Sequence, residues 1–182
     1  MKTKDEISII GGGLAGLIAA IDLSKRNFNV LLFEKNDYPK HKVCGEFISN
    51  EVLPYLKYLD LAIESLNPTK ININQLSTHS GKTIESDLPL GGFGISRFAL
   101  DNYLYNTFLE LGGKVVKEVV TKVGFFTDDF TVFTQNNDIY TSKIVLGAFG
   151  KRSNLDMQGL GKEDTSQFWT KDCEFWLKMN KY

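Results

Sequence analysis

The sequence predicts an α/β fold: a parallel β-sheet flanked by helices, with a three-stranded antiparallel meander and a small additional β-hairpin. Three observations predict it. The chain opens with an apolar β-branched run over 7–10, a glycine-rich turn and an apolar run of helical period. A second apolar run over 29–34 completes a strand–helix–strand unit. Short strand-like runs between about 119 and 142, separated by turns rich in Asp and Asn, are typical of a meander.

The composition narrows the class of protein. A chain of 182 residues with 42% hydrophobic and 24% charged residues is typical of one soluble domain with room for an appendage. The net charge of −1 gives no electrostatic argument for a nucleic acid or a membrane surface. No apolar run reaches the length of about 18 residues that a membrane span requires. Cys44 and Cys173 cannot form a disulfide framework, which predicts a cytoplasmic protein, and they show no zinc-ligand spacing with the two histidines, so we predict no metal.

The glycine-rich turn is the most informative stretch of the chain. Its glycines stand at Gly11, Gly13 and Gly16, where the first permits a tight turn, the second lets a pyrophosphate approach and the third lets the helix pack on the strand. The amides at the start of that helix attract phosphate. Glu34 ends the second strand, 23 positions after Gly11 (34 − 11), where dinucleotide sites place a carboxylate for the ribose. We therefore predict a dinucleotide site; the alternative is a strand–turn–helix without a ligand.

The remaining elements follow from local periodicity and turn residues. The Lys-rich segment 35–46 lacks apolar periodicity, which predicts a loop. The first helix buries Leu14, Leu17, Ile18 and Ile21, the next Val52, Leu53, Leu56 and Leu59, and the third Leu100, Leu104, Phe108 and Leu111. In order, we expect a helix capped by Ser49 or Asn50, a hairpin of 71–76 and 83–85, a helix over 98–111 ended by Gly112 and Gly113, a sheet strand at 115–116, a meander of 119–126, 130–134 and 139–142, and a buried strand over 143–150. Beyond Leu155 the pattern fits either a polar loop or a terminal helix over 171–179.

Four stretches, in this order, resemble the flavoproteins built on the glutathione-reductase type of FAD-binding Rossmann fold. The closest resemblance is to the branch that holds aromatic-ring hydroxylases, flavin-dependent halogenases and geranylgeranyl reductases. The stretches are Gly11–Gly16 with Glu34, Lys42–Glu46, Ser96–Arg97 with Leu100–Asp101, and Gly147–Ser153. Together they cover roughly residues 5 to 156, whereas one glycine motif alone is weak evidence.

The resemblance implies that the chain binds FAD. Gly11, Gly13 and Gly16 are expected at the pyrophosphate, Glu34 at the adenosine ribose, and Arg97 at the flavin nucleotide, since a guanidinium keeps its charge and offers paired donors. The blander alternative makes Arg97 a solvated residue at a helix start. The resemblance also implies further cofactor contacts, from Leu14, Ala15, Lys35, Cys44, Gly45, Val119, Ala148 and Gly150.

Two residues of the loop have several possible roles. Cys44 is read as lining the flavin pocket, with a redox thiol or an exposed bystander as alternatives. Glu46 is read as a solvated carboxylate, with an acid or a substrate-orienting group as the alternative. No catalytic residue is assigned from the sequence. It also contains no Gly-x-Ser-x-Gly elbow and no Gly-Lys-Ser/Thr phosphate loop, so we expect neither hydrolase nor NTPase chemistry.

The resemblance also predicts the domain organisation. Residues 1–156 are expected to form the FAD-binding domain, with a substrate-side β segment at about 70–95. The tail 157–182 is interpreted as the truncated start of the next domain, with a natural terminus and a frame-altered end as the alternatives. Family enzymes have a separate substrate domain and run to roughly twice this length. Phe149 stands where the hydroxylases carry an Asp, so their way of docking NAD(P)H is not carried over, although NAD(P)H is a candidate electron donor.

The leading functional hypothesis is an FAD-dependent oxidoreductase, or the FAD-binding part of one. Its flavin would pass hydride to an unsaturated small molecule or react with oxygen to modify one. The alternatives are a non-catalytic FAD-binding module and an NAD-binding dehydrogenase domain. We expect a small-molecule substrate and no nucleic-acid partner, and the sequence leaves the oligomeric state open.

Overall fold

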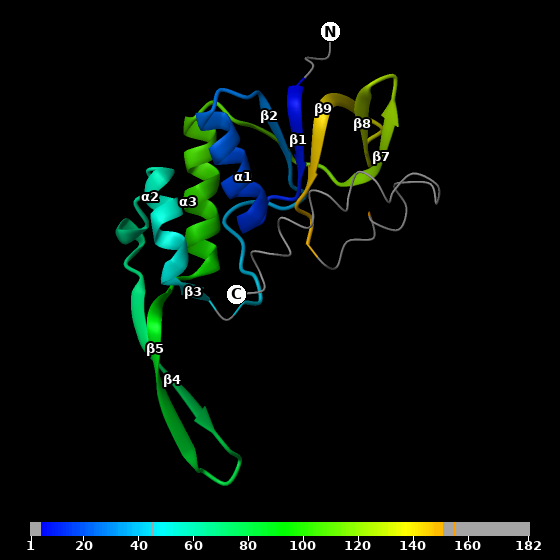
Figure 1. The fold of residues 1–182 in the computed structure, drawn as a ribbon. Helices are drawn as coiled ribbons and strands as arrows, with labels where there is room; N and C mark the ends of the chain where they lie inside the picture. Colours follow the sequence, from blue (N-terminus) through cyan, green and yellow to red (C-terminus); the bar gives the residue numbers. More distant parts are fainter. Residues whose placement is uncertain (1–4, 45, 151–154, 156–182) are drawn as a thin grey trace.

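The computed structural model describes residues 5–44, 46–150 and 155. These residues form a six-stranded sheet, a separate three-stranded antiparallel sheet and helices that cover the larger sheet (Figure 1). The predicted fold class, a sheet of Rossmann type with an antiparallel meander, is confirmed. The predictions for Gly45, for the tail 157–182 and for the terminal helix over 171–179 lie outside the described residues.

The strand order of the larger sheet places β1 (Asp5–Ile10) at its centre. The order is β6 (Lys114–Val116), β2 (Val30–Phe33), β1, β9 (Ile139–Gly147), β8 (Asp129–Thr134) and β7 (Val120–Phe126). β1 pairs parallel with both β2 and β9, and β2 pairs parallel with β6. The carboxyl ends of these four strands therefore meet at one edge of the sheet, which is where open α/β sheets bind ligands.

β9 is one continuous strand where the sequence predicts two. The expected third meander strand over 139–142 and the expected separate strand over 143–150 are a single element that ends at Gly147. Its first residues pair antiparallel with β8 and its later residues pair parallel with β1, and Ser142 has a partner on both sides. The division was wrong because Lys143 interrupts the apolar pattern, yet its side chain leaves the sheet surface and forms an ion pair with β8. The meander is thus an extension of the main sheet.

Two helices cover one face of the sheet. α1 (Leu14–Lys25) and α3 (Arg97–Glu110) lie side by side (Figure 1), and their fully buried residues pack with those of β1 and β2 in one core. The shared buried residues are Leu17, Ile21, Leu104, Phe108, Ile9 and Leu32. Alternate residues of the same strands face the other side and pack with the meander. The buried faces predicted for these helices are confirmed, except at Leu111, which lies beyond the end of α3 and is 41% exposed.

The segment predicted as a second amphipathic helix is shorter and more exposed than expected. Ser49 caps a 3₁₀ turn, η1 (Asn50–Val52), by accepting a hydrogen bond from the Glu51 amide, and α2 (Leu53–Tyr58) follows. Val52 and Leu53 are exposed, because this short helix lies outside α3 and only its inner side reaches the core. A second 3₁₀ turn, η2 (Ile63–Leu66), leads into the smaller sheet.

The smaller sheet is dominated by a long hairpin. Its order is β3 (Phe47–Ser49), β5 (Thr83–Gly94) and β4 (Thr69–Ser77). The hairpin predicted over 71–76 and 83–85 is present and longer, since the glycine-rich residues before Ile95 continue β5 and pair with β3 and β4. The distal part of β4 and β5 projects away from the body of the molecule (Figure 1).

Candidate nucleotide-binding site

The turn after β1 requires glycine at two positions, at Gly11 for its backbone angle and for lack of space, and at Gly16 for lack of space. Gly11 has φ +107°, in the region that favours glycine, and its amide donates to the carbonyl of Phe33 at 2.8 Å. A Cβ on Gly11 would clash with the backbone oxygen of Ala148, and one on Gly16 would clash with the carbonyl oxygen of Gly11. The turn is therefore pressed between α1 and the end of β9. In dinucleotide-binding turns, the first glycine permits the tight turn and the third permits close packing of the helix on the strand, and Gly11 and Gly16 occupy these two positions.

Gly13 differs from the other glycines of the turn. It is the N-cap of α1, and a Cβ built on it would meet no described atom within 4 Å. Within the described part of the chain, no side chain hydrogen-bonds this cap, and the first turn of α1 holds no acidic residue. The amides of Leu14, Ala15 and Gly16 lack intrahelical acceptors, because they belong to the first turn. Among the described residues, none therefore fills the space beside Gly13, in front of a positively polarised helix end.

Glu34, directly after β2, faces this turn. Its Oε2 accepts a hydrogen bond from the Gly12 amide at 2.9 Å, and its Oε1 accepts from the amide of Asn36 at 2.9 Å and from the Asn36 Nδ2 at 2.6 Å. A carboxylate has about four acceptor positions, so these three donors leave one for a ligand hydroxyl. Glu34 is thereby fixed at the same sheet edge as the open helix end.

Tyr38 also contacts the turn, beside Glu34, and the sequence gives no signal for it. Its hydroxyl donates to the carbonyl oxygen of Gly12, and its ring stacks on Tyr105 of α3 with centroids 4.3 Å apart. Burial, together with the negative charges of Glu34 and Asp101, raises the pKa of Tyr38 far above its usual value. The phenol therefore remains a hydrogen-bond donor to the turn throughout the ordinary pH range.

The loop 41–46 lies along the first turns of α3. The ring of His41 stacks on Phe98 with centroids 4.5 Å apart. At the other end of the loop, the carboxylate of Glu46 accepts from the Arg97 amide at 3.0 Å, and its carbonyl accepts from the Ile95 amide at 3.1 Å. The second and third stretches of the family resemblance, remote in sequence, are therefore in contact.

Arg97 and Cys44 are brought together at this contact. The side chain of Arg97 is 14% exposed, so the alternative of a solvated residue is wrong. Its Nε and Nη2 donate to the two carboxylate oxygens of Asp101 at 2.8 and 3.0 Å. Burial lowers the pKa of Arg97, but hydrogen bonds with Asp101 and with the thiol of Cys44 outweigh it, and the pKa lies above its ordinary value. Cys44 is an exposed, reduced thiol, and its sulfur also accepts a hydrogen bond from the Glu46 amide at 3.4 Å.

A narrow pocket joins the two parts of the site. Its volume is ≈ 10 Å³, enough for about one water molecule. It is lined by Glu34, Asn36, Asp37, Tyr38, Lys40, Lys42 and Asp101. The carboxylate of Glu34, beside the glycine turn, and the ion pair of Lys42 with Asp101 of α3 therefore line the same pocket.

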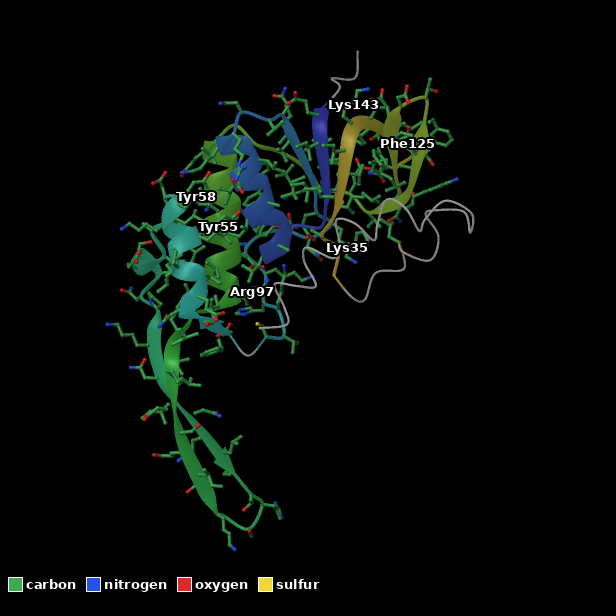
Figure 2. All side chains as sticks on the ribbon, in the orientation of Figure 1. Lys35, Tyr55, Tyr58, Arg97, Phe125 and Lys143 are labelled. Carbon is green, nitrogen blue, oxygen red and sulfur yellow. The ribbon has the colours of Figure 1, made fainter. Side chains whose placement is uncertain are left out.

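The other predicted site residues lie along the same edge or beside it. Ala148 follows β9, and its amide donates to the Ile10 carbonyl at 2.8 Å, against the glycine turn. Gly150 has φ +75°, in the chain segment that leaves β9. Val119 precedes β7, and its carbonyl accepts a hydrogen bond from the Gln135 amide. Figure 2 shows Lys35 and Arg97 towards the end of the sheet where these turns lie, and Lys143 at the opposite end.

The described residues form neither a metal site nor a membrane-spanning helix. Across the described ranges, His, Cys, Asp and Glu side chains form no group of three or more suited to a metal ion. The helices in those ranges are all too short or too polar to cross a membrane.

Comparison with known proteins places this site in a family context. A family model described as an NAD(P)-binding Rossmann-like domain matches residues 9–41. The putative FAD-dependent oxidoreductase LodB of Marinomonas mediterranea is 33% identical over 124 residues, which cover 64% of this chain and 33% of LodB. The FAD-dependent monooxygenase olcE of Penicillium canescens is 28% identical over 169 residues, which cover 85% of this chain and 36% of olcE. The chain thus spans about a third of the length of these relatives.

The structural comparison agrees in fold. The crystal structure of p-nitrophenol 4-monooxygenase PnpA from Pseudomonas putida superposes with a TM-score of 0.74 at 16% identity, covering 84% of this chain and 42% of PnpA. The resemblance to the FAD-binding Rossmann flavoproteins is confirmed, and the relatives are FAD-dependent oxidoreductases and monooxygenases, which are enzymes. The geranylgeranyl reductase part of the resemblance stays a prediction.

Proposed function

We propose that this chain, which has the fold of the FAD-binding flavoproteins, is the FAD-binding part of an FAD-dependent oxidoreductase. The observation that carries the proposal is the space at Gly13 that no described residue fills, which lies before a helix end that no described side chain caps and beside an oriented carboxylate. A diphosphate suits this space, since the amides of Leu14, Ala15 and Gly16 offer donors and the helix end offers positive potential.

The ribose of the nucleotide would lie at Glu34. Three protein donors hold this carboxylate in place, and its remaining acceptor position suits a ribose hydroxyl. A 2′-phosphate on that ribose would be repelled by the carboxylate, so FAD or NAD suits the site better than NADP. The FAD dependence named for LodB and olcE supports FAD over NAD.

The flavin end would lie towards Arg97 and Cys44. Arg97 offers a fixed cation at the end of the sheet where the glycine turn lies, and the loop 41–46 supplies the wall beside it. When bound, FAD supplies the redox chemistry, and the chain's own residues bind and orient it. Hydride transfer to an unsaturated small molecule, or oxygen-dependent modification of one, are the reactions that we propose for the whole protein. NAD(P)H is a candidate electron donor.

We also propose that residues 1–156 form the FAD-binding domain and that the hairpin within 70–95 belongs to the substrate side. The cross-strand pair of Leu76 and Ile84 supports the placement of the hairpin, because these apolar side chains are 66% and 73% exposed. A two-stranded hairpin on its own is only marginally stable in water, so a further protein surface that covers this pair would stabilise it. For the tail 157–182 we keep the proposal that it begins a further domain.

The test is the absorbance spectrum of the purified chain after incubation with FAD and removal of free cofactor. We expect a bound-flavin spectrum, bleached by a chemical reductant. A folded chain that takes up NAD and not FAD would reverse the proposal in favour of a dehydrogenase domain. If the bound flavin is reduced but does not reoxidise with oxygen or any acceptor, the non-catalytic module is favoured.

A further inference from the structure

Asp101 is a buried carboxylate whose role neither the fold nor the glycine turn explains. It lies in α3, and its side chain is 1% exposed. Two cations hold it: the Arg97 guanidinium, and the Lys42 ammonium at 2.8 Å from Oδ2. A charge buried this deeply is costly unless it is paired and hydrogen-bonded, as this one is.

The geometry of the pair fixes one edge of Arg97 and leaves another. A guanidinium has five N–H donors in a rigid plane, which provide two forked edges. Asp101 takes the edge formed by Nε and Nη2. The edge formed by Nη1 and the outer hydrogen of Nη2 is not used by this carboxylate. With the side chain locked, that second edge has a fixed direction and is suited to a phosphate or to neighbouring hydroxyls.

A second pair of Arg and Asp in the chain makes a similar contact but is exposed to solvent, which sets the buried pair apart. Asp22 of α1 and Arg26, the C-cap of that helix, also lie four residues apart and form a two-pronged contact, at 2.8 and 3.2 Å. Their side chains are 55% and 17% exposed, and they lie away from the glycine turn. Exposed pairs of this kind contribute little. By contrast, Asp101 of the buried pair lines the pocket that reaches Glu34, together with its second partner Lys42.

We propose that Asp101 is a positioning residue: it aims the edge of Arg97 that it does not itself bind at oxygen atoms of the bound dinucleotide, beside the Cys44 thiol that also contacts this guanidinium, and through Lys42 it ties the loop that holds Lys42 to α3. The inference rests on the proposed function, since it assumes that FAD is the ligand. It goes further by assigning a role to a carboxylate that itself touches no ligand.

The test is a double-mutant cycle on FAD affinity, with the full chain and flavin fluorescence as the signal. We expect Asp101→Asn to weaken FAD binding by about tenfold, the value of one charge-assisted hydrogen bond, and Arg97→Met to weaken it at least as much. The double variant should bind no more weakly than Arg97→Met alone. Asp22→Asn is the matched control and should bind FAD as the unaltered chain does.

A purely structural role gives different results. If the losses of Asp101→Asn and Arg97→Met add in the double variant, or if Asp101→Asn binds FAD normally, the inference is overturned. Should Asp101→Asn fail to fold, Arg97→Lys decides: it keeps the charge beside Asp101 and removes the fork, so normal FAD affinity there also overturns the inference.

Titration with ADP identifies which oxygen atoms of the dinucleotide the second edge of Arg97 meets. If Asp101→Asn weakens both ADP and FAD, the edge meets the diphosphate. If it weakens FAD alone, the edge meets the ribityl chain or the flavin. Both results support the positioning role. If the unaltered chain takes up no FAD, the proposed function fails and the inference with it; FAD uptake with an unchanged Asp101→Asn affinity overturns the inference alone.

Discussion

Gly13→Val separates binding from folding at the glycine turn. Gly13 has φ −81° and ψ −173°, which any residue adopts, and its Cβ would meet no described atom within 4 Å. Losing glycine at this N-cap costs about 0.5–1 kcal/mol, and 1 kcal/mol lowers Tm by roughly 2–4 °C in a chain of this size. The valine side chain would fill the place where a diphosphate meets the first-turn amides. Each charge-assisted hydrogen bond contributes about 1.5–3 kcal/mol, so losing two lowers FAD affinity by roughly a hundredfold or more.

The assay pairs FAD titration with thermal denaturation of the ligand-free chain. Gly16→Ala is the contrasting variant, because its new methyl would clash with the Gly11 carbonyl oxygen and lower Tm well beyond the shift of Gly13→Val. Normal FAD affinity in Gly13→Val would refute the placement of the diphosphate. A Tm for Gly13→Val as low as that of Gly16→Ala would refute the claim that the space beside Gly13 is open.

Two further predictions concern regions away from the turn. Burial, and then the hydrogen bond to Asp22, raise the pKa of Tyr55 to about 12 from 10.0. The contribution of Tyr55 to stability is therefore present below pH 10 and is lost as the pH rises towards 12. The free energy of unfolding, measured by urea denaturation between pH 10 and 12, should fall less steeply in Tyr55→Phe than in the unaltered chain, and an equal fall in both would contradict the pKa shift. Replacing residues 74–86 by an Asn-Gly turn between the paired Ile73 and Asp87 should leave both Tm and FAD uptake of the chain nearly unchanged, because the removed side chains are exposed; loss of FAD uptake would place the hairpin inside the nucleotide site.

Local patterns were enough to predict the elements that carry the turn. The glycine spacing, the apolar runs beside it and Glu34 all lie within 30 residues of one another, so periodicity and spacing suffice. The helix capped by Ser96 was predicted to within one residue. The unity of β9 was missed because Lys143, a charged residue within an apolar run, looks like a boundary when only neighbours in sequence are considered.

Contacts between remote segments were beyond such patterns. Arg97 was expected at the site, but the sequence indicated no ion pair between Arg97 and Asp101, which appeared only as part of a motif. The second cation that binds Asp101, Lys42, lies 59 positions away in the sequence (101 − 42). Tyr38 gave no signal at all, since a tyrosine in a Lys-rich loop is indistinguishable from a solvated one until α3 brings Tyr105 against it. The chemistry of individual residues was readable, whereas their pairing depends on how the chain folds back.

The pairing of β1 with β9 determines when the site can exist during synthesis. Among the strands that the structure describes, β1 is synthesised first and β9 last, yet the two are neighbours in the sheet, and Ala148 contacts the turn that follows β1. A nascent chain that has not yet exposed residues 139–148 has the nucleotide loop but lacks one of its walls. Translation therefore delivers the glycine loop early and the surface that shapes it more than a hundred residues later, so cofactor capture has to follow the completion of the sheet.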